Sequence, residues 1–130
     1  MPRPAQYHLL VLPDGRRETV DCLAAMIRHH ATVPTVILDI SAADRLNIDT
    51  LAVLLRKAMR LRAAGGELLL TGPTLAVRKL IERTGTTCLL RTLPGRAAAV
   101  RHLARDGRTW RPVPLAQGRG TLFAELAEHL

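Results

Sequence analysis

The chain has 130 residues, which is enough for one domain with a modest core. Hydrophobic residues make up 48% and charged residues 23% of the sequence, and this composition excludes a disordered or collagen-like chain. The formal net charge is +8, from 19 Lys and Arg against 11 Asp and Glu, so nucleic-acid binding has to be weighed as a function.

Cellular location is predicted from features that the sequence lacks. No apolar run approaches the roughly 18 residues that cross a bilayer, and the N-terminus does not have the pattern of a signal peptide. The two cysteines, Cys22 and Cys88, are far apart and have no metal-binding spacing, so we expect two reduced thiols. We therefore predict a cytoplasmic protein without membrane contact.

Strand and helix patterns alternate in the first half of the chain. A short apolar strand at 8–12 precedes a helix over 19–30, and residues 34–41 have the nearly continuous apolarity of a central strand. The strongest helix spans 48–64 and ends at Gly65-Gly66. Its apolar stripe is Leu51, Leu54, Leu55, Ala58 and Leu61, and we expect Asp49, Val53, Arg56 and Arg60 on the opposite face.

The same alternation continues in the second half. A buried strand at 67–71 is followed by a helix through Arg83 that Thr74 caps. A short strand over 88–93 and a helix from Pro94 to Leu103 come next, and then a loop or irregular strand around Trp110. The inward residues predicted for the Thr74-capped helix are Leu75, Val77, Leu80 and Ile81.

This alternation indicates an α/β fold with at least some parallel strand pairing. We predict one domain over residues 1–105, with a mixed central sheet packed against helices and the strands 36–40 and 68–71 as its central neighbours. Residues 106–130 form an extension that ends in a short helix over 121–130. The apolar stripe of that helix predicts packing on the domain or on a second copy of the chain; it consists of Leu122, Phe123, Leu126 and Leu130.

Sequence motifs of catalytic, cofactor and metal sites are absent. There is no GxxxxGK[ST], GxGxxG or GxSxG pattern, and Ser41, the only serine, follows a predicted core strand where a turn role suffices. His29 and His30 are adjacent, so they diverge by about 100° on a helix and have no third ligand. We therefore expect no enzyme, metal or cofactor site, including at the three carboxylates Asp39, Asp44 and Asp49.

Four segments stand in a fixed order and spacing. They are Val36-Ile-Leu-Asp-Ile-Ser41, Asn47-Ile-Asp-Thr-Leu51, Leu68-Leu-Leu-Thr-Gly-Pro73 and Val77-Arg-Lys-Leu-Ile-Glu-Arg-Thr-Gly85, with Gly65-Gly66 between the second and the third. Together they resemble the STAS domain, the bacterial module of anti-sigma-factor antagonists. Each segment alone is weak, but their combined order is fairly specific and covers about half of the chain. The resemblance implies a STAS-like α/β fold.

One position departs from the family pattern. In the family, a kinase phosphorylates a serine or threonine at the start of this helix, and the phosphate prevents the antagonist from binding its anti-sigma kinase. The resemblance places Asp49 at that phospho-acceptor, with Thr50 as the nearest hydroxyl. A carboxylate resembles the phosphorylated state with about one charge instead of nearly two, so we do not expect the usual switch. Independently of the family, Asn47 is a suitable N-cap and Asp49 complements the helix dipole.

We therefore expect a protein–protein interaction domain that regulates transcription. The resemblance implies an anti-sigma factor or a serine/threonine kinase-like protein as partner, with homodimer formation left open. The binding surface would be the start and outer face of the 48–64 helix. Its expected exposed residues are Asp44, Asn47, Asp49, Thr50, Val53 and Arg56.

Two other classes of function remain as alternatives. A nucleic-acid-binding module would use the basic segment 91–119, although the arginines are scattered and the three aromatic residues are too few for a stacking platform. A steep salt dependence of DNA binding would identify it. A small α/β enzyme would instead need a well-formed polar pocket.

Overall fold

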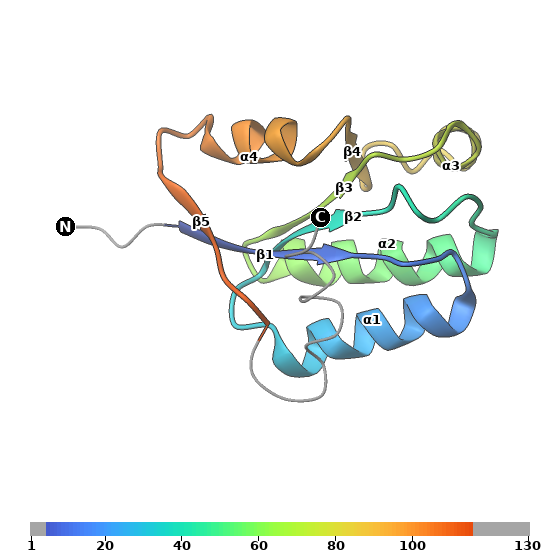
Figure 1. Cartoon of the computed structure of the whole chain (residues 1–130), viewed down its shortest axis with the longest axis horizontal. Helices are drawn as coiled ribbons and strands as arrows, with labels where there is room; N and C mark the ends of the chain where they lie inside the picture. Colours follow the sequence, from blue (N-terminus) through green and yellow to red (C-terminus); the bar gives the residue numbers. More distant parts are fainter. Residues whose placement is uncertain (1–4, 116–130) are drawn as a thin grey trace.

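Five strands form one sheet in the order β4-β3-β2-β1-β5 in the computed structural model, which describes residues 5–115 (Figure 1). Strands and helices alternate along these residues, as the sequence predicted. The strands are β1 (Ala5–Val11), β2 (Thr35–Asp39), β3 (Glu67–Thr71), β4 (Arg91–Leu93) and β5 (Trp110–Pro112). The helices are α1 (Arg17–His30), α2 (Ile48–Ala63), α3 (Leu75–Arg83) and α4 (Arg96–Ala104).

Every pairing between the described strands is parallel, so the prediction of a mixed sheet was wrong. A helix separates each strand from the next one along the chain, and such a crossover returns the chain to the same end of the sheet. The predicted neighbours at the centre are confirmed, because Val36 pairs with Leu68 and Leu38 pairs with Leu70. Helix α2 joins these two strands.

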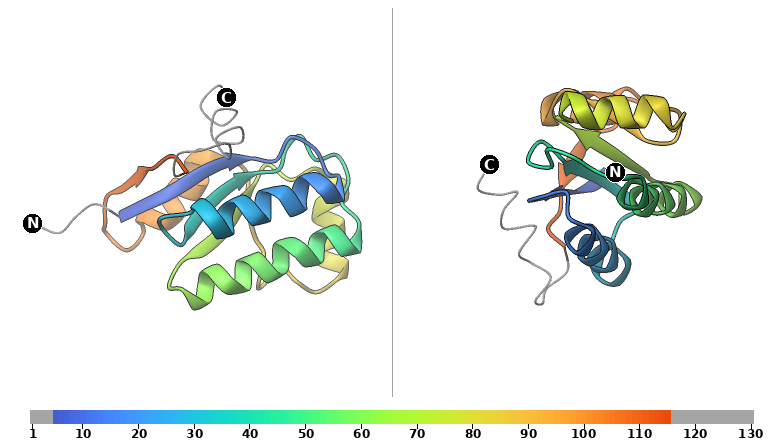
Figure 2. Two further views of the ribbon diagram at one scale, coloured as in Figure 1. Left: turned by 90° about the horizontal axis from the view of Figure 1, so that it is seen from below. Right: turned by 90° about the vertical axis from the view of Figure 1, so that its right-hand side faces the viewer.

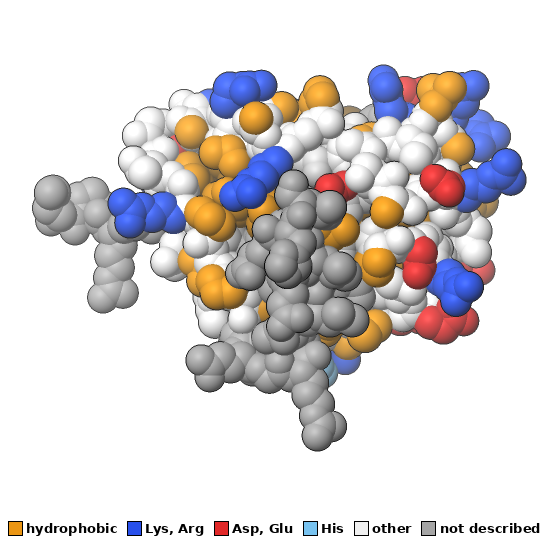
Figure 3. Space-filling view, viewed as in Figure 1, with side chains coloured by type: hydrophobic (Ala, Val, Ile, Leu, Met, Phe, Trp, Pro, Cys, Tyr) orange, Lys and Arg blue, Asp and Glu red, His pale blue; other side chains and the backbone are white. Residues whose placement is uncertain are grey.

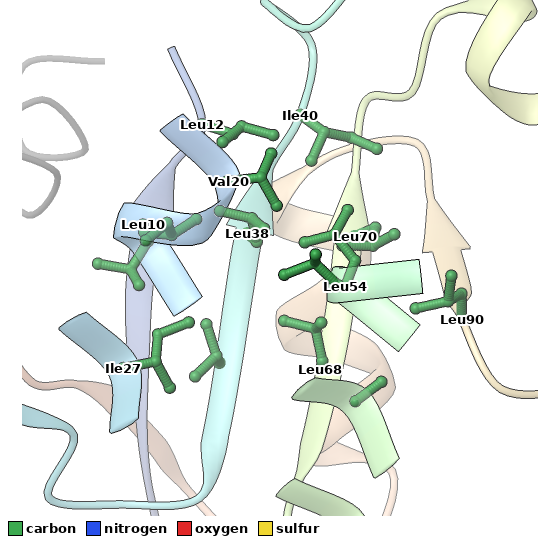
Figure 4. Close-up of a cluster of buried hydrophobic side chains, with 14 of the residues drawn as sticks. Leu10, Leu12, Val20, Ile27, Leu38, Ile40, Leu54, Leu68, Leu70 and Leu90 are labelled. Atoms are coloured by element: carbon green, nitrogen blue, oxygen red, sulfur yellow. The ribbon is translucent and has the colours of Figure 1, made fainter. Parts of the chain in front are cut away.

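Helices cover both faces of the sheet. Helices α1 and α2 run side by side over one face, and α4 lies on the other (Figure 2). In β2, Val36 and Leu38 belong to the larger hydrophobic cluster with α1 and α2, whereas Ile37 belongs to the smaller cluster beneath α4. This double burial explains the continuous apolarity of the central strands. Figure 4 shows side chains of the larger cluster.

Local signals set the beginning of α3. The Oγ1 of Thr74 accepts a 3.3 Å hydrogen bond from the Val77 N–H, which confirms the predicted cap. Val77 and Ile81 are buried at a spacing of one helical turn. The inward position predicted for Leu75 was wrong: its side chain is 64% exposed, because it lies about 200° around the helix from Val77.

Two element boundaries differ from the predicted ones. Strand β4 begins at Arg91 instead of residue 88, because residues 87–90 form a turn in which the Leu90 N–H donates to the Thr86 carbonyl at 2.8 Å. Helix α4 begins at Arg96 with Gly95 as its N-cap, so Pro94 precedes the helix instead of opening it. Both differences are at the edge of the sheet.

Strand β5 brings the Trp110 segment into the sheet. It pairs with β1 through Ala5↔Trp110 and Gln6↔Arg111, so the irregular strand expected there is an edge strand of the domain. The described fold therefore continues beyond the boundary expected at residue 105. The helix predicted over 121–130 lies outside the described residues.

Three findings complete the description of residues 5–115. Cys22 and Cys88 are both exposed and free of any disulfide. No helix in this range is long and apolar enough to cross a membrane. Within the same range, no three His, Cys, Asp or Glu side chains gather as they would around a metal ion.

Candidate functional site at the start of helix α2

The loop between β2 and α2 carries the predicted binding surface. Ile40 and Ala43 in this loop are fully buried, and they leave Asp44 exposed between them and the helix. The Ala43 N–H donates to the Ile40 carbonyl at 3.0 Å, and the Asp39 carboxylate accepts the Ser41 N–H at 2.8 Å. Buried apolar side chains and a hydrogen-bonded turn therefore hold the loop in place.

The loop is also tied to helix α3. The Thr74 hydroxyl donates a 3.0 Å hydrogen bond to the backbone carbonyl of Asp44, while the same oxygen accepts the Val77 N–H. One side chain thus caps α3 and fixes the loop that precedes α2. This bond brings the beginnings of α2 and α3 together at the carboxyl ends of β2 and β3.

Asn47 is the N-cap of α2. Its Oδ1 accepts two hydrogen bonds from Thr50, one from the backbone N–H and one from the side-chain hydroxyl, both at 2.8 Å. This confirms the predicted capping role. The exposed carboxylate of Asp49 is in the first helical turn, where a negative charge is favoured by the helix dipole.

Thr50 and Val53 were expected to be exposed, and that expectation was wrong. Both side chains are buried, together with Lys57. These three residues are spaced i, i+3 and i+7, which places them on one flank of α2. Helix α1 packs beside α2, and Val53 and Lys57 line the groove between the two helices. The part of α2 that faces neither α1 nor the sheet remains open to a partner.

The remaining predicted residues separate into two places. Asp44, Asn47 and Asp49 are exposed around the start of α2. Arg56 is exposed two turns further along and lines a groove between α1 and α2. The structure therefore groups the first three and sets Arg56 apart from them.

Two exposed apolar residues near this site were missed by the sequence reasoning. Ile48 is the first residue of α2 and is 66% exposed, and Leu75 has the same position and a similar exposure in α3. One signal was present for Ile48, because it is outside the apolar stripe predicted for its helix. Leu75 instead matched the apolar pattern of its helix, so the sequence offered no signal for its exposure.

The structure gives little support to the alternative of a small α/β enzyme. A cavity of about 220 Å³ lies at the carboxyl ends of the strands, and its polar lining includes Asp39, Ser41 and Thr71. Among residues 5–115, no histidine lines it, so the Ser–His pair of a serine nucleophile is not seen there. The Asp39 carboxylate is engaged with the Ser41 backbone, which is a turn-forming role.

The structure also gives little support to the alternative of nucleic-acid binding. Within the described part of the basic segment, Arg91 lies 3.7 Å from Glu67, and Arg108 pairs with Asp106 at 2.7 Å. The Arg108 guanidinium also lies 4.9 Å from the centre of the Trp110 ring. On the face drawn in Figure 3, several Lys and Arg side chains gather at the upper right, around α3, and the others are scattered. A continuous basic track is not seen on that face.

Comparisons with known proteins agree on the fold. The family model of the STAS domain matches residues 17–99, more than half of the chain. The crystal structure of a candidate anti-sigma factor antagonist from Thermotoga maritima, TM1081, is similar with a TM-score of 0.62 and 13% sequence identity, covering 79% of this chain and 85% of that chain. An NMR structure of TM1081 gives 0.64 and 14%, with 75% and 82% covered. No curated protein sequence matches the chain.

Proposed function

Because the chain belongs to the STAS domain family, we propose that it is a regulatory protein–protein interaction domain that acts as an anti-sigma-factor antagonist. The family match carries this proposal, and the similarity in fold to a candidate antagonist supports it. The proposed partner is an anti-sigma factor or a serine/threonine kinase-like protein. A binding role, without catalysis, accounts for the site as it stands.

The proposed contact surface is the start of α2. Asp44, Asn47 and Asp49 are exposed there, beside the apolar side chain of Ile48. A large exposed apolar residue rimmed by polar groups is typical of a protein-binding surface. The bond from Thr74 to Asp44 restrains the loop before binding, which reduces the entropy that association would cost.

Asp49 places an exposed carboxylate on this surface. The sequence resemblance implies that Asp49 stands at the family's phospho-acceptor position, and on that basis we propose that the protein is not switched by phosphorylation in the usual way. A fixed carboxylate at the contact is expected to weaken binding to a partner that buries the site, because the charge must be desolvated. The effect is local, since the chain's net charge of +8 does not oppose approach of an acidic partner.

The test is a binding experiment with the anti-sigma kinase of the same genome. Surface plasmon resonance would compare the wild type with Asp49→Ser, and we expect the variant to dissociate about tenfold more slowly. Glu18→Ser is the matched control, because Glu18 is also an exposed carboxylate in the first turn of a helix. Equal dissociation rates for all three proteins would leave Asp49 as a helix-start residue only, and lack of any binding would contradict the proposed function itself.

A further inference from the structure

A groove of about 320 Å³ lies between α1 and α2. These two helices cover the face of the sheet away from α4 (Figure 2). The groove is separate from the contact surface proposed above, because none of its lining residues belongs to that surface. Its lining residues are Asp21, Ala24, Ala25, Arg28, Val53, Arg56, Lys57 and Arg60. The two alanines leave room between the helices that larger side chains would fill.

The charge of this groove is strongly unbalanced. Arg28, Arg56, Lys57 and Arg60 contribute four cations, and Asp21 is the one carboxylate among the lining residues. Asp21 is already engaged, because its carboxylate pairs with Arg17 one turn earlier in α1 at 3.1 Å. The groove therefore concentrates positive charge that its own side chains do not neutralise.

Lys57 is the unusual member of this group. Its side chain is only 8% exposed, yet none of the ion pairs among residues 5–115 involves it. Buried lysines are rare unless they are paired. Burial, together with the nearby charges of Arg60 and Arg28, lowers the pKa of the Lys57 ammonium. A bound anion would supply the missing counter-charge.

The lining also indicates which kind of anion fits. Guanidinium groups donate paired hydrogen bonds that match the oxygens of phosphate, and three of the four cations are arginines. The volume corresponds to about ten water molecules, which is more than one phosphate occupies. Among residues 5–115, no aromatic side chain lines the groove, so this part of the chain offers no surface on which a nucleobase would stack.

From this geometry we propose that the groove between α1 and α2 binds a small ligand carrying a chain of two or more phosphates. The ligand is recognised through its phosphates by Arg28, Arg56, Lys57 and Arg60. Free polyphosphate and nucleoside polyphosphates share this chemistry. Because the four cations are the lining groups that would bind phosphate, both sources should bind with about equal affinity.

Isothermal titration calorimetry with tripolyphosphate tests the proposal at an ionic strength of about 0.15 M, where distant charges are screened. We expect one site per chain. The double variant Arg28→Gln/Arg56→Gln should bind at least about tenfold more weakly, since it loses two sets of charge-assisted hydrogen bonds. The matched control is Arg101→Gln/Arg105→Gln, which removes the same charge from exposed positions in and after α4, on the other face of the sheet. It should stay within about twofold of the wild type.

The other arms of the experiment distinguish the remaining outcomes. ATP should match tripolyphosphate, and a tenfold preference for ATP would contradict recognition by phosphates alone. Equal losses of affinity in the two double variants would overturn the site, because they would show that the overall charge of the protein attracts the ligand. Absence of tripolyphosphate binding would also overturn it. Tighter binding of a short DNA duplex, abolished by Arg28→Gln/Arg56→Gln, would replace the small ligand by nucleic acid. Asp49→Ser should bind tripolyphosphate like the wild type, which separates this test from that of the proposed function.

Discussion

The hydroxyl of Thr50 donates a 2.8 Å hydrogen bond to the side-chain oxygen of Asn47, and the Thr50 side chain is completely buried. Phosphoryl transfer needs an accessible hydroxyl that is in line with the phosphate. We therefore predict that an anti-sigma kinase with ATP adds no phosphate to Thr50, as read by mass spectrometry. Asp49→Ser is the positive control and should gain one phosphate, because that side chain position is exposed. Stoichiometric phosphate on Thr50 of the wild type would contradict the prediction.

The hydrogen bonds between Thr50 and Asn47 should also stabilise the folded protein. Asn47→Ala removes the oxygen that accepts both bonds from Thr50, so it should lower the free energy of unfolding by about 1–2 kcal/mol. Asn47→Asp keeps an acceptor at the N-cap and adds a charge that the helix dipole favours, so it should stay within about 0.5 kcal/mol of the wild type. Urea unfolding measures both variants. Equal losses would show that capping is not what Asn47 contributes.

The chain has only two lysines, Lys57 and Lys79, and the effect of their burial on stability can be compared directly. Lys57 is buried and Lys79 is exposed. Lys57→Met removes a charge from a side chain that is mostly buried, so it should raise the free energy of unfolding at neutral pH by at most about 1 kcal/mol, because solvent screens part of the penalty. Lys79→Met should change it by less than about 0.5 kcal/mol.

The pH dependence of that gain has a definite sign. The pKa of Lys57 is lowered in the folded state by burial, so the unfolded chain holds its proton to higher pH than the folded chain does. The penalty for the charged side chain is therefore complete below the lowered pKa, and it disappears as the pH rises to the ordinary value of about 10.4. The advantage of Lys57→Met over the wild type should shrink over this range in thermal unfolding experiments. An advantage that stays constant would mean that packing, and not charge, causes it.

The type and order of the elements could be predicted because they depend on local patterns. The apolar run ending at Ile40 and the cap at Thr74 are both local, and both agree with the structure. The exposure of residues on α2 could not be predicted in the same way. Thr50, Val53 and Lys57 are buried on a helix that packs against α1, and a hydrophobicity pattern does not count threonine or lysine as contact residues. Where a second helix lies against the first is a property of the tertiary fold.

His8 is another polar residue whose burial depends on the tertiary fold. The side chain is completely buried in β1. Its Nδ1 donates to the Val113 carbonyl at 2.8 Å, and its Nε2 accepts the Thr32 N–H at 3.0 Å. This arrangement requires the neutral ring, because protonated Nε2 would face a backbone donor. One imidazole thus connects β1 to the chain before β2 and to the segment after β5.

Acid should therefore weaken the fold through His8. Burial lowers the pKa of the His8 imidazole, and the hydrogen bond to Val113 opposes the shift in part. The unfolded chain then binds a proton near pH 6.5 while the folded chain does not, so stability is complete above about pH 6.5 and falls as the pH drops. The slope cannot exceed about 1.4 kcal/mol per pH unit for one group. Urea unfolding between about pH 5.5 and 7.5, above the range of ordinary carboxylates, measures it.

Two variants separate His8 from the other four histidines. His8→Gln should lower the free energy of unfolding by about 2 kcal/mol at pH 7.5, because buried hydrogen-bonding groups lose their partner, and it should flatten the slope below pH 6.5. His29→Gln changes an exposed histidine and should keep the wild-type slope. Hydrogen exchange gives a local readout, since the Val113 N–H donates to the Tyr7 carbonyl at 2.8 Å. That amide should exchange faster in His8→Gln, and a wild-type slope in this variant would show that another group titrates.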